Sequence, residues 1–180
     1  MLAPRDAGSR TKKVRFMEMS IRSLKPTDAD ALWRINEEGL PGVGQVSSQA
    51  LEALLEMSEL SLGAVVAGQL EGFVICLLPG TSYGSPNYGW FNARYREFLY
   101  VDRIAVGQSA RGLGLGSALY RRVIGHAETR SWPVAAEVSL EPPNPGSLRF
   151  HGRFSFDRVG ELAHPTQRVA MLLRAAQPLA

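Results

Sequence analysis

The sequence is short of the residues that build disulfides, metal sites and membrane spans. Its one cysteine, Cys76, excludes an internal disulfide framework and any metal site made of several cysteines. The three histidines are scattered without a ligand spacing, so we expect no metal. No apolar run approaches the length of a transmembrane helix and nothing indicates export. We therefore expect a soluble, cytoplasmic protein that does not bind membranes.

The body of the chain also lacks an excess of charge of one sign. Residues 1–18 hold five basic and two acidic side chains, and the remaining residues hold fifteen of each. The net charge of +3 therefore belongs to the first segment, which argues against nucleic-acid binding by the body. We expect residues 1–18 to be a disordered tail or an over-long gene start. Residues 19–180 should form one domain, a usual size for a single α/β unit.

Hydrophobic periodicity predicts strands and helices in mixed order. Alternating apolar residues indicate strands, and apolar residues three and four apart indicate helices. Thr27 should cap the first helix, and Ser47 or Ser48 the second. The expected strands are 20–25, 61–67, 70–78, 98–106, 133–140, 156–161 and 168–174, and the expected helices are 27–38, 49–57, 113–129 and 144–153.

Residues 79–97 form a long connection between two expected strands. The segment is rich in turn residues at its start and in aromatic residues at its end. A connection of this length in a compact domain is typically functional or mobile. Tyr88 and Trp90 are therefore weak candidates for substrate contacts in a lid, although such aromatic residues more often serve local packing.

A glycine-rich turn, Ser109-Ala-Arg-Gly-Leu-Gly-Leu-Gly-Ser117, joins an expected strand to an expected helix. Glycine allows positive φ and the close approach of a ligand, and a helix N-terminus offers unpaired N–H groups, so the turn suits a pyrophosphate. No lysine follows Gly116, which excludes a Walker loop. The third glycine of a dinucleotide fingerprint is missing too, because Ser117 or Leu119 stands in its place.

The pattern that does fit this turn is Arg-x-x-Gly-x-Gly, filled by Arg111, Gly114 and Gly116. At these residues the sequence resembles the GNAT superfamily of N-acetyltransferases. In that family such a loop binds the pyrophosphate of acetyl-CoA through backbone N–H groups. The strand before it, here residues 102–106, resembles the one that splays from its neighbour and pairs with the pantetheine arm.

A second segment, residues 137–156, strengthens the resemblance. It is similar to the family's strand, helix that starts at an asparagine, and Phe-Tyr…Gly-Phe close, with Asn144 in place and Phe150-His151 where Phe-Tyr is usual. The Pro-Pro-Asn-Pro run at 142–145 resembles one branch of predicted acetyltransferases. The resemblance covers about residues 20–174. It implies an α/β fold with a central mixed, mostly antiparallel twisted sheet of about seven strands flanked by about four helices.

The resemblance also implies that acetyl-CoA is the co-substrate. Its expected contacts are the end of the strand before the turn, the turn itself, and two residues of the later helix. These residues are Ile104, Ala105, Val106, Arg111, Gly112, Leu113, Gly114, Leu115, Gly116, Ser117, Asn144 and Phe150.

Amine acetylation needs a group that accepts the amine's proton and a donor to the departing thiolate. Glu137 matches a base position used in some family members, and His151 stands where the family's acid tyrosine is usual. One ring nitrogen of His151 could donate toward the sulfur and the other could act as a base, so the base stays open between these two residues. Asp102 and Arg103 should lie on opposite faces of their strand, with one of them facing the acceptor. Arg103 should share its face with Leu99, Val101 and Ala105.

The function implied by the resemblance is transfer of an acetyl group from acetyl-CoA to a primary amine, by direct attack on the thioester. The amine could belong to a small molecule or a protein. An alternative is a GNAT-fold module that binds or senses acyl-CoA with weakened catalysis, because His151 and Ser155 depart from the family pattern. The sequence does not name the acceptor, and it leaves a homodimer open.

Overall fold

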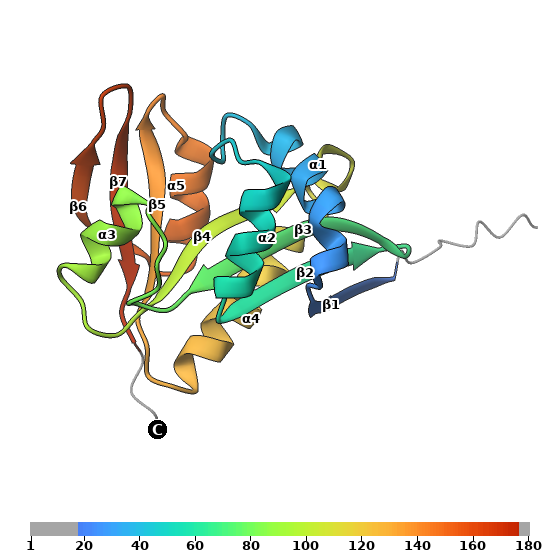
Figure 1. Cartoon of the computed structure of the whole chain (residues 1–180), viewed down its shortest axis with the longest axis horizontal. Helices are drawn as coiled ribbons and strands as arrows, with labels where there is room; N and C mark the ends of the chain where they lie inside the picture. The colour runs from blue at the N-terminus through green and yellow to red at the C-terminus, as the bar shows by residue number, and fades with distance from the viewer. Residues whose placement is uncertain (1–17, 177–180) are drawn as a thin grey trace, which may run out of the picture.

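Seven strands form one twisted sheet in the computed structural model, which describes residues 18–176 (Figure 1). Their order is β1-β2-β3-β4-β5-β7-β6, and all neighbours are antiparallel except β4 and β5. The predicted mixed, mostly antiparallel sheet is confirmed. The strands are β1 (Met19–Ser23), β2 (Leu60–Val66), β3 (Gln69–Leu77), β4 (Leu99–Val106), β5 (Val134–Glu141), β6 (Asp157–Ala163) and β7 (Arg168–Arg174).

Helices cover both faces of the sheet and bury two apolar cores. One core lies under α1 (Ala29–Gly39), α2 (Ser48–Met57) and α3 (Pro86–Asn92). The other lies under α4 (Leu115–Glu128) and α5 (Pro145–Gly152). Five α-helices form where the sequence predicted about four, because part of the long connection at 79–97 is helical.

The N-terminal cap of α2 is the one that the sequence predicts, and the N-terminal cap of α1 is not. Ser47 caps α2, with its Oγ accepting from the Ala50 N–H over 3.1 Å. Thr27 does not cap the first helix. A 3₁₀ turn over residues 26–28 precedes α1, and the Asp28 carboxylate accepts from the Lys25 N–H over 2.8 Å.

The parallel pair β4 and β5 separates after a short contact. Only Leu99 with Val134 and Tyr100 with Ala135 are paired, although each strand has eight residues. Beyond these pairs β4 stays hydrogen-bonded to β3, and β5 to β7. The sheet therefore opens between β4 and β5, where backbone groups of both strands are free to meet a ligand.

A β-bulge lies in β4 at Asp102. On β3, Ile75 pairs with Arg103 and the next residue, Cys76, pairs with Val101, so Asp102 is an extra residue in the ladder. A bulge re-aims side chains and reverses the alternation beyond it. The prediction that Leu99, Val101, Arg103 and Ala105 share one face is therefore wrong. Leu99 and Val101 pack under α4, whereas Ala105 packs in the core under α1.

The long connection folds back onto the sheet through α3. Ser85 caps this helix, and Tyr88 and Phe91 are 1% and 0% exposed in the core under α1 to α3. Trp90 lies against Gly160 of β6, where a Cβ atom would come within 2.6 Å of the indole. In Figure 1, α3 lies beside the hairpin of β6 and β7. The segment is a packed element, because its aromatic residues fill the core.

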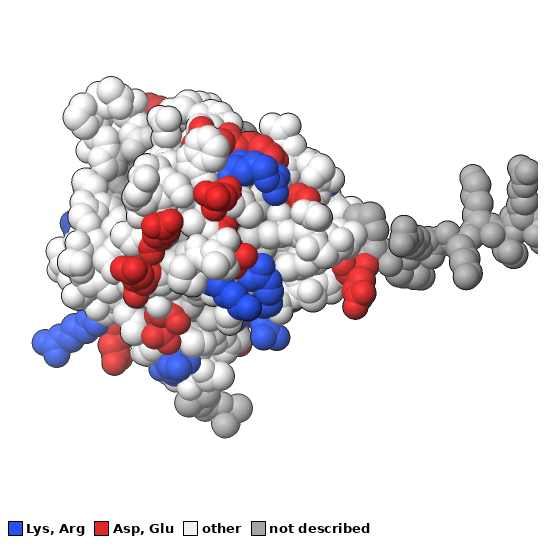
Figure 2. All heavy atoms as spheres, turned by 45° about the vertical axis from the view of Figure 1, so that its right-hand side comes forward, with Lys and Arg blue, Asp and Glu red and all other residues white. Residues whose placement is uncertain are grey.

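The surface shows no field of one sign on the face drawn in Figure 2, where acidic and basic side chains are interspersed. Among residues 18–176, no helix combines the length and the apolar character that crossing a membrane needs. Residues 1–17, almost all of the predicted tail, lie outside the described residues.

Candidate active site

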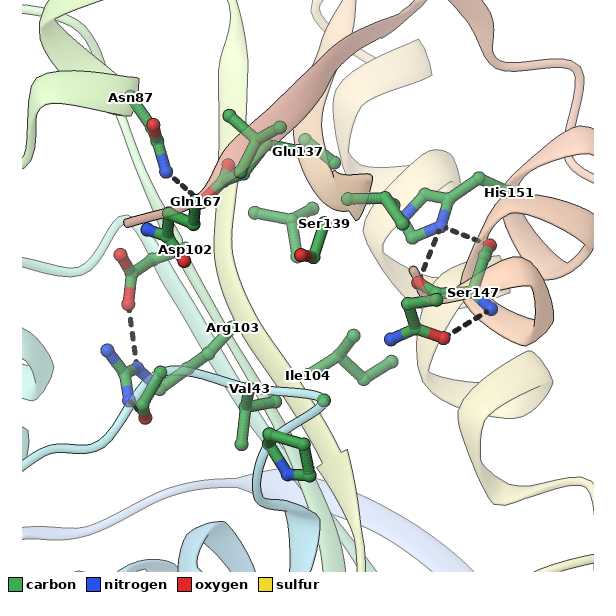
Figure 3. Close-up of a pocket in the computed structure, with 18 of the residues that line it drawn as sticks. Val43, Asn87, Asp102, Arg103, Ile104, Glu137, Ser139, Ser147, His151 and Gln167 are labelled. Atoms are coloured by element: carbon green, nitrogen blue, oxygen red, sulfur yellow. Dashed lines mark hydrogen bonds and ion pairs between the residues drawn. The ribbon is translucent and has the colours of Figure 1, made fainter. Parts of the chain in front are cut away.

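A cavity of about 300 Å³ occupies the opening between β4 and β5 (Figure 3). Its walls come from β4, β5, one side of α5 and the end of the β6–β7 hairpin, with single side chains from α3 and α4. The loop 41–44 after α1 covers one side. In Figure 3, Glu137, Asn87 and Asp102 stand at one end, and Ser147 and His151 at the other. The two predicted catalytic residues therefore line one cavity from opposite ends.

Glu137 is held at the first end by a side chain that the sequence did not single out. Its Oε1 accepts from Asn87 Nδ2 over 3.0 Å, and among the described residues its buried Oε2 has no hydrogen-bond partner. Burial raises the pKa of Glu137 to about 7, and the nearby Asp102 adds to the rise. The hydrogen-bonding groups of Tyr100 and Asn87 and the charge of Arg103 oppose it. A carboxyl group in this range can exchange a proton at neutral pH.

Asp102 and Arg103 both line the cavity, so the prediction that only one of them faces it is wrong. The bulge turns them together, and Arg103 Nε donates to Asp102 Oδ2 over 2.7 Å. Arg103 Nη1 also donates to Asn36 Oδ1 over 3.0 Å and lies 3.4 Å from the Gly44 carbonyl oxygen. Arg103 therefore ties β4 to the end of the covering loop.

His151 lies at the other end, 3% exposed. Its Nδ1 lies 2.8 Å from the Ser147 carbonyl oxygen, and its Nε2 lies 2.6 Å from the Tyr120 hydroxyl. A carbonyl oxygen only accepts, so Nδ1 carries the ring proton and Nε2 accepts from Tyr120. Burial lowers the pKa of His151, more than the Ser147 carbonyl raises it. The imidazole is therefore neutral, and both of its nitrogens are engaged.

Tyr120 is the functional candidate that sequence reasoning missed at this end. It lies on the buried face of α4, is 0% exposed, and lines the cavity beside His151. Burial raises its pKa well above the ordinary value, so the hydroxyl keeps its proton. From sequence it is one of many apolar-face residues of a helix, and only its pairing with a residue 31 positions away marks it.

The glycine turn has the geometry expected of an anion site. Gly112 and Gly114 have φ of 82° and 80°, and a Cβ atom on either would meet nothing within 4 Å. The turn is therefore open on that side. The N–H groups of Leu115, Gly116 and Ser117 form the first turn of α4, where a helix has no internal acceptor for them. Together with the helix dipole they suit a phosphate group.

The other expected co-substrate residues divide between this opening and its surroundings. Ile104 and Asn144 line the cavity, and the Asn144 side chain also caps α5 by accepting from the Ser147 N–H over 3.1 Å. Phe150 packs against Tyr120 with ring centroids 4.9 Å apart. Ala105 and Val106 continue β4 along the opening, and Leu113 is exposed. Arg111 points elsewhere, because its Nη2 donates to the Glu38 carbonyl oxygen over 2.8 Å.

Two weak candidates lie outside the cavity lining. The Tyr88 hydroxyl donates to the Leu78 carbonyl oxygen over 2.6 Å, and its ring is buried in the core. Trp90 stacks under the Arg94 guanidinium at 3.9 Å and against Gly160. Over residues 18–176, no group of three or more His, Cys, Asp or Glu side chains is arranged to hold a metal ion.

Comparison with known proteins identifies the family that this arrangement resembles. Residues 30–156 match the model of the Acetyltransferase (GNAT) family. No curated protein matches the sequence. The ribosomal-protein-S18-alanine N-acetyltransferase from Escherichia coli superposes with a TM-score of 0.72 at 16% identity, covering 91% of this chain and 97% of that one.

Two further solved structures are similar in fold. Ard1 from Thermoplasma volcanium has a TM-score of 0.72 at 18% identity and covers 89% of this chain and 99% of its own. Arabidopsis thaliana NAA60 in complex with acetyl-CoA has a TM-score of 0.70 at 17% identity, with 88% and 98% covered. At such identities the likeness shows a common fold.

Proposed function

Since the chain belongs to the acetyltransferase (GNAT) family and is an acetyl-CoA-dependent N-acetyltransferase, we propose that Glu137 is the base that activates its amine acceptor. The observation that carries this proposal is the Glu137 carboxyl group in the opening between β4 and β5, with its Oε2 atom buried and its pKa raised to about 7. At and above that pH the carboxylate is available to take a proton from an ammonium group.

The acceptor that we propose is a primary amine that arrives as an ammonium ion. Arg103 already pairs with Asp102 in the cavity lining, so the charge that favours a cation there is that of the Glu137 carboxylate. Proton transfer to Glu137 frees the nitrogen lone pair, which attacks the thioester carbonyl carbon. The C–N bond then forms and the C–S bond breaks, while a second proton moves from nitrogen to sulfur.

At the other end we propose that Tyr120 stabilises the departing thiolate and that His151 acts through it. Tyr120 is the donor of this pair, since Nδ1 of His151 already donates to the Ser147 carbonyl. The hydroxyl can turn from Nε2 toward the sulfur as negative charge develops there. His151 is then a positioning residue and is not itself the acid or the base. Tyr120 is the donor to the thiolate, and Glu137 is the base.

Co-substrate binding is proposed to follow the glycine turn and the free edge of β4. The open N–H groups at 115–117 suit the pyrophosphate, and Ile104, Ala105 and Val106 lie along the opening where a pantetheine arm can pair. Asn144 stands beside this path. We further propose a cytoplasmic enzyme, since acetyl-CoA is made and used inside cells.

The test is acetyl transfer by the purified protein, followed by release of free thiol from acetyl-CoA. The amine panel pairs small primary amines with short peptides that have free N-termini, because one fold neighbour is named for the alanine of ribosomal protein S18. Glu137→Gln should lower kcat by about 10² to 10⁴ and leave acetyl-CoA affinity unchanged. Wild-type kcat in this variant would remove Glu137 as the base, and binding without turnover of any amine would indicate an acyl-CoA sensor.

A further inference from the structure

Two segments outside the glycine turn and α5 meet at Glu137. Asn87 comes from α3, and His164 comes from the hairpin between β6 and β7. Asn87 Nδ2 donates to Glu137 Oε1 over 3.0 Å, and Asn87 Oδ1 lies 2.8 Å from His164 Nε2. Figure 3 shows the Asn87 amide aimed at Glu137. The partners lie 50 and 77 positions apart in sequence, so only the fold brings them together.

Resting on the proposed role of Glu137, we propose that Asn87 and His164 are positioning residues that fix the Glu137 carboxylate toward the acceptor amine. The long connection at 79–97 then serves catalysis through one amide side chain. Its aromatic residues pack in the core and against β6, and so hold that side chain in place.

The hydrogen-bond chemistry of the three side chains allows one arrangement. An ionised carboxylate only accepts, so the NH₂ group of Asn87 must face Glu137. The Asn87 oxygen then faces His164 and must accept, which requires a proton on Nε2 of His164. Each residue thereby fixes the orientation of the next. Without the His164 donor, the Asn87 amide could turn its oxygen toward the carboxylate, which would repel it.

The helix that carries Asn87 is firmly seated. Tyr88, the next residue, is 1% exposed and donates to the Leu78 carbonyl oxygen over 2.6 Å. Trp90 fits over Gly160 of β6, where any larger residue would collide with the indole. The two sides of α3 thus contact the sheet and the hairpin, so Asn87 is held before substrate arrives. Catalytic groups held by packed neighbours lose little free energy to reorganisation.

The charges around Glu137 predict what the Asn87 contact does. Burial and then the charge of Asp102 raise the pKa of the carboxyl group, and the nearby Tyr100 hydroxyl, the hydrogen bond from Asn87 and the charge of Arg103 lower it. Tyr120 faces the same region from α4, and His164 reaches it through Asn87. Loss of the Asn87 donor should therefore raise the pKa of Glu137 further.

The experiment compares Asn87→Leu with the wild-type enzyme in the pH dependence of kcat. The leucine keeps the side-chain volume and removes the donor. On the acidic side of the profile, kcat falls as Glu137 becomes protonated, and we call this part the acidic limb. We expect its midpoint to move up by about one pH unit in Asn87→Leu. At pH values below the midpoint kcat should then fall about tenfold, while the alkaline plateau changes less. His164→Phe should move the limb the same way, and His164→Gln, which keeps an N–H donor, should restore it.

A matched control comes from the same helix. Asn92 accepts from the Gly80 N–H over 3.1 Å and does not touch Glu137. Asn92→Leu removes a hydrogen bond of similar kind, so it should leave the acidic limb in place. An equal movement of the limb in Asn92→Leu and Asn87→Leu would overturn the proposal, because the effect would then come from α3 stability.

A second readout does not depend on turnover. Carboxyl carbon NMR of the protein labelled at glutamate, with Glu137→Gln to assign the resonance, reports the Glu137 titration directly. A titration of Glu137 that is the same in Asn87→Leu and the wild type overturns the positioning role, whatever the kinetics show. Wild-type kcat in Glu137→Gln, with a titration that does respond to Asn87→Leu, overturns the base assignment instead. The two failures are therefore distinguishable.

Discussion

Burial acts in the same way at the two ends of the cavity but on different chemical groups. At the end that holds Glu137, which we call the amine end after the proposed acceptor, burial raises the pKa of Glu137 to about 7. At the end that holds His151 and Tyr120, which we call the thiolate end after the proposed leaving group, burial lowers the pKa of His151 and raises that of Tyr120. In each case the neutral form is favoured, because a low-dielectric site disfavours charge. The outcome differs with the group: a carboxyl becomes a base poised at neutral pH, and a phenol and an imidazole become a pair that stays uncharged.

This difference indicates which end of the cavity can accommodate a charge during the reaction. At one end Asp102 is paired with Arg103, so an entering cation would be stabilised there by the Glu137 carboxylate. Tyr120 and His151 are hydrogen-bonded to each other over 2.6 Å at the other end, and the Tyr120 hydroxyl donates elsewhere only when a stronger acceptor appears. A departing thiolate is such an acceptor.

The largest expected effect tests this division at the thiolate end. Tyr120→Phe keeps the ring and removes the hydroxyl, so kcat should fall by about 10² to 10⁴ with acetyl-CoA affinity unchanged. His151→Phe should cost less, because Tyr120 keeps its proton without its acceptor. The double variant should match Tyr120→Phe, since the two residues act as one unit. Steady-state kinetics at pH 8 measures all three.

The reverse order of effects would break the comparison. A larger loss in His151→Phe than in Tyr120→Phe would make the imidazole the direct proton donor. The expression level and melting temperature of both variants serve as the control for folding, because each residue is buried.

A smaller effect is expected on stability at the amine end. The folded pKa of Glu137, about 7, lies above the ordinary 4.5, so its contribution to stability is full below pH 4.5 and is lost as the pH rises through 7. Glu137→Gln mimics the neutral form at every pH. Its free energy of unfolding relative to that of the wild type should therefore increase by up to about 3 kcal/mol from about pH 5 to about pH 8. Urea unfolding at both pH values measures the gain. Glu52→Gln, on the exposed side of α2, is the control and should show none.

The smallest effect concerns the neighbour of the base. Asp102→Asn removes a like charge that raises the pKa of Glu137, so the acidic limb of kcat should move down by less than about one pH unit. Glu141→Gln, at the exposed end of the same strand as Glu137, should leave the limb in place. Both the lost repulsion and the freed Arg103 charge favour the ionised Glu137, so an upward movement in Asp102→Asn would contradict the role given to Asp102.

The sequence predicts the elements of this fold better than their contacts. The glycine turn before α4, the Asn144 start of α5 and the seven strands follow from spacing and turn chemistry, which are local properties. The opening between β4 and β5 follows from the family resemblance, since no local pattern specifies where two parallel strands separate.

The rest depends on one extra residue and on distant partners. Alternation assumes an unbroken ladder, so the bulge at Asp102 reverses every assignment beyond it in β4. The pairs of Tyr120 with His151 and of Asn87 with Glu137 join elements that periodicity treats separately. The helix α3 escapes prediction because it has seven residues and no repeated apolar spacing, and its core contacts stabilise it.

The two-pair contact between β4 and β5 has a consequence for how the molecule holds together. Five hydrogen-bonded junctions in the sheet are long, and this one joins the two halves by Leu99 with Val134 and Tyr100 with Ala135 alone. Acetyl-CoA bound in this gap as we propose would pair with β4 and fill the space beside β5, so the two halves of the sheet would be joined most rigidly while the reaction runs. The same bonds must break before the product leaves. Tighter binding in the gap between β4 and β5 would therefore hold the reactants in line more firmly and would also slow the release of coenzyme A.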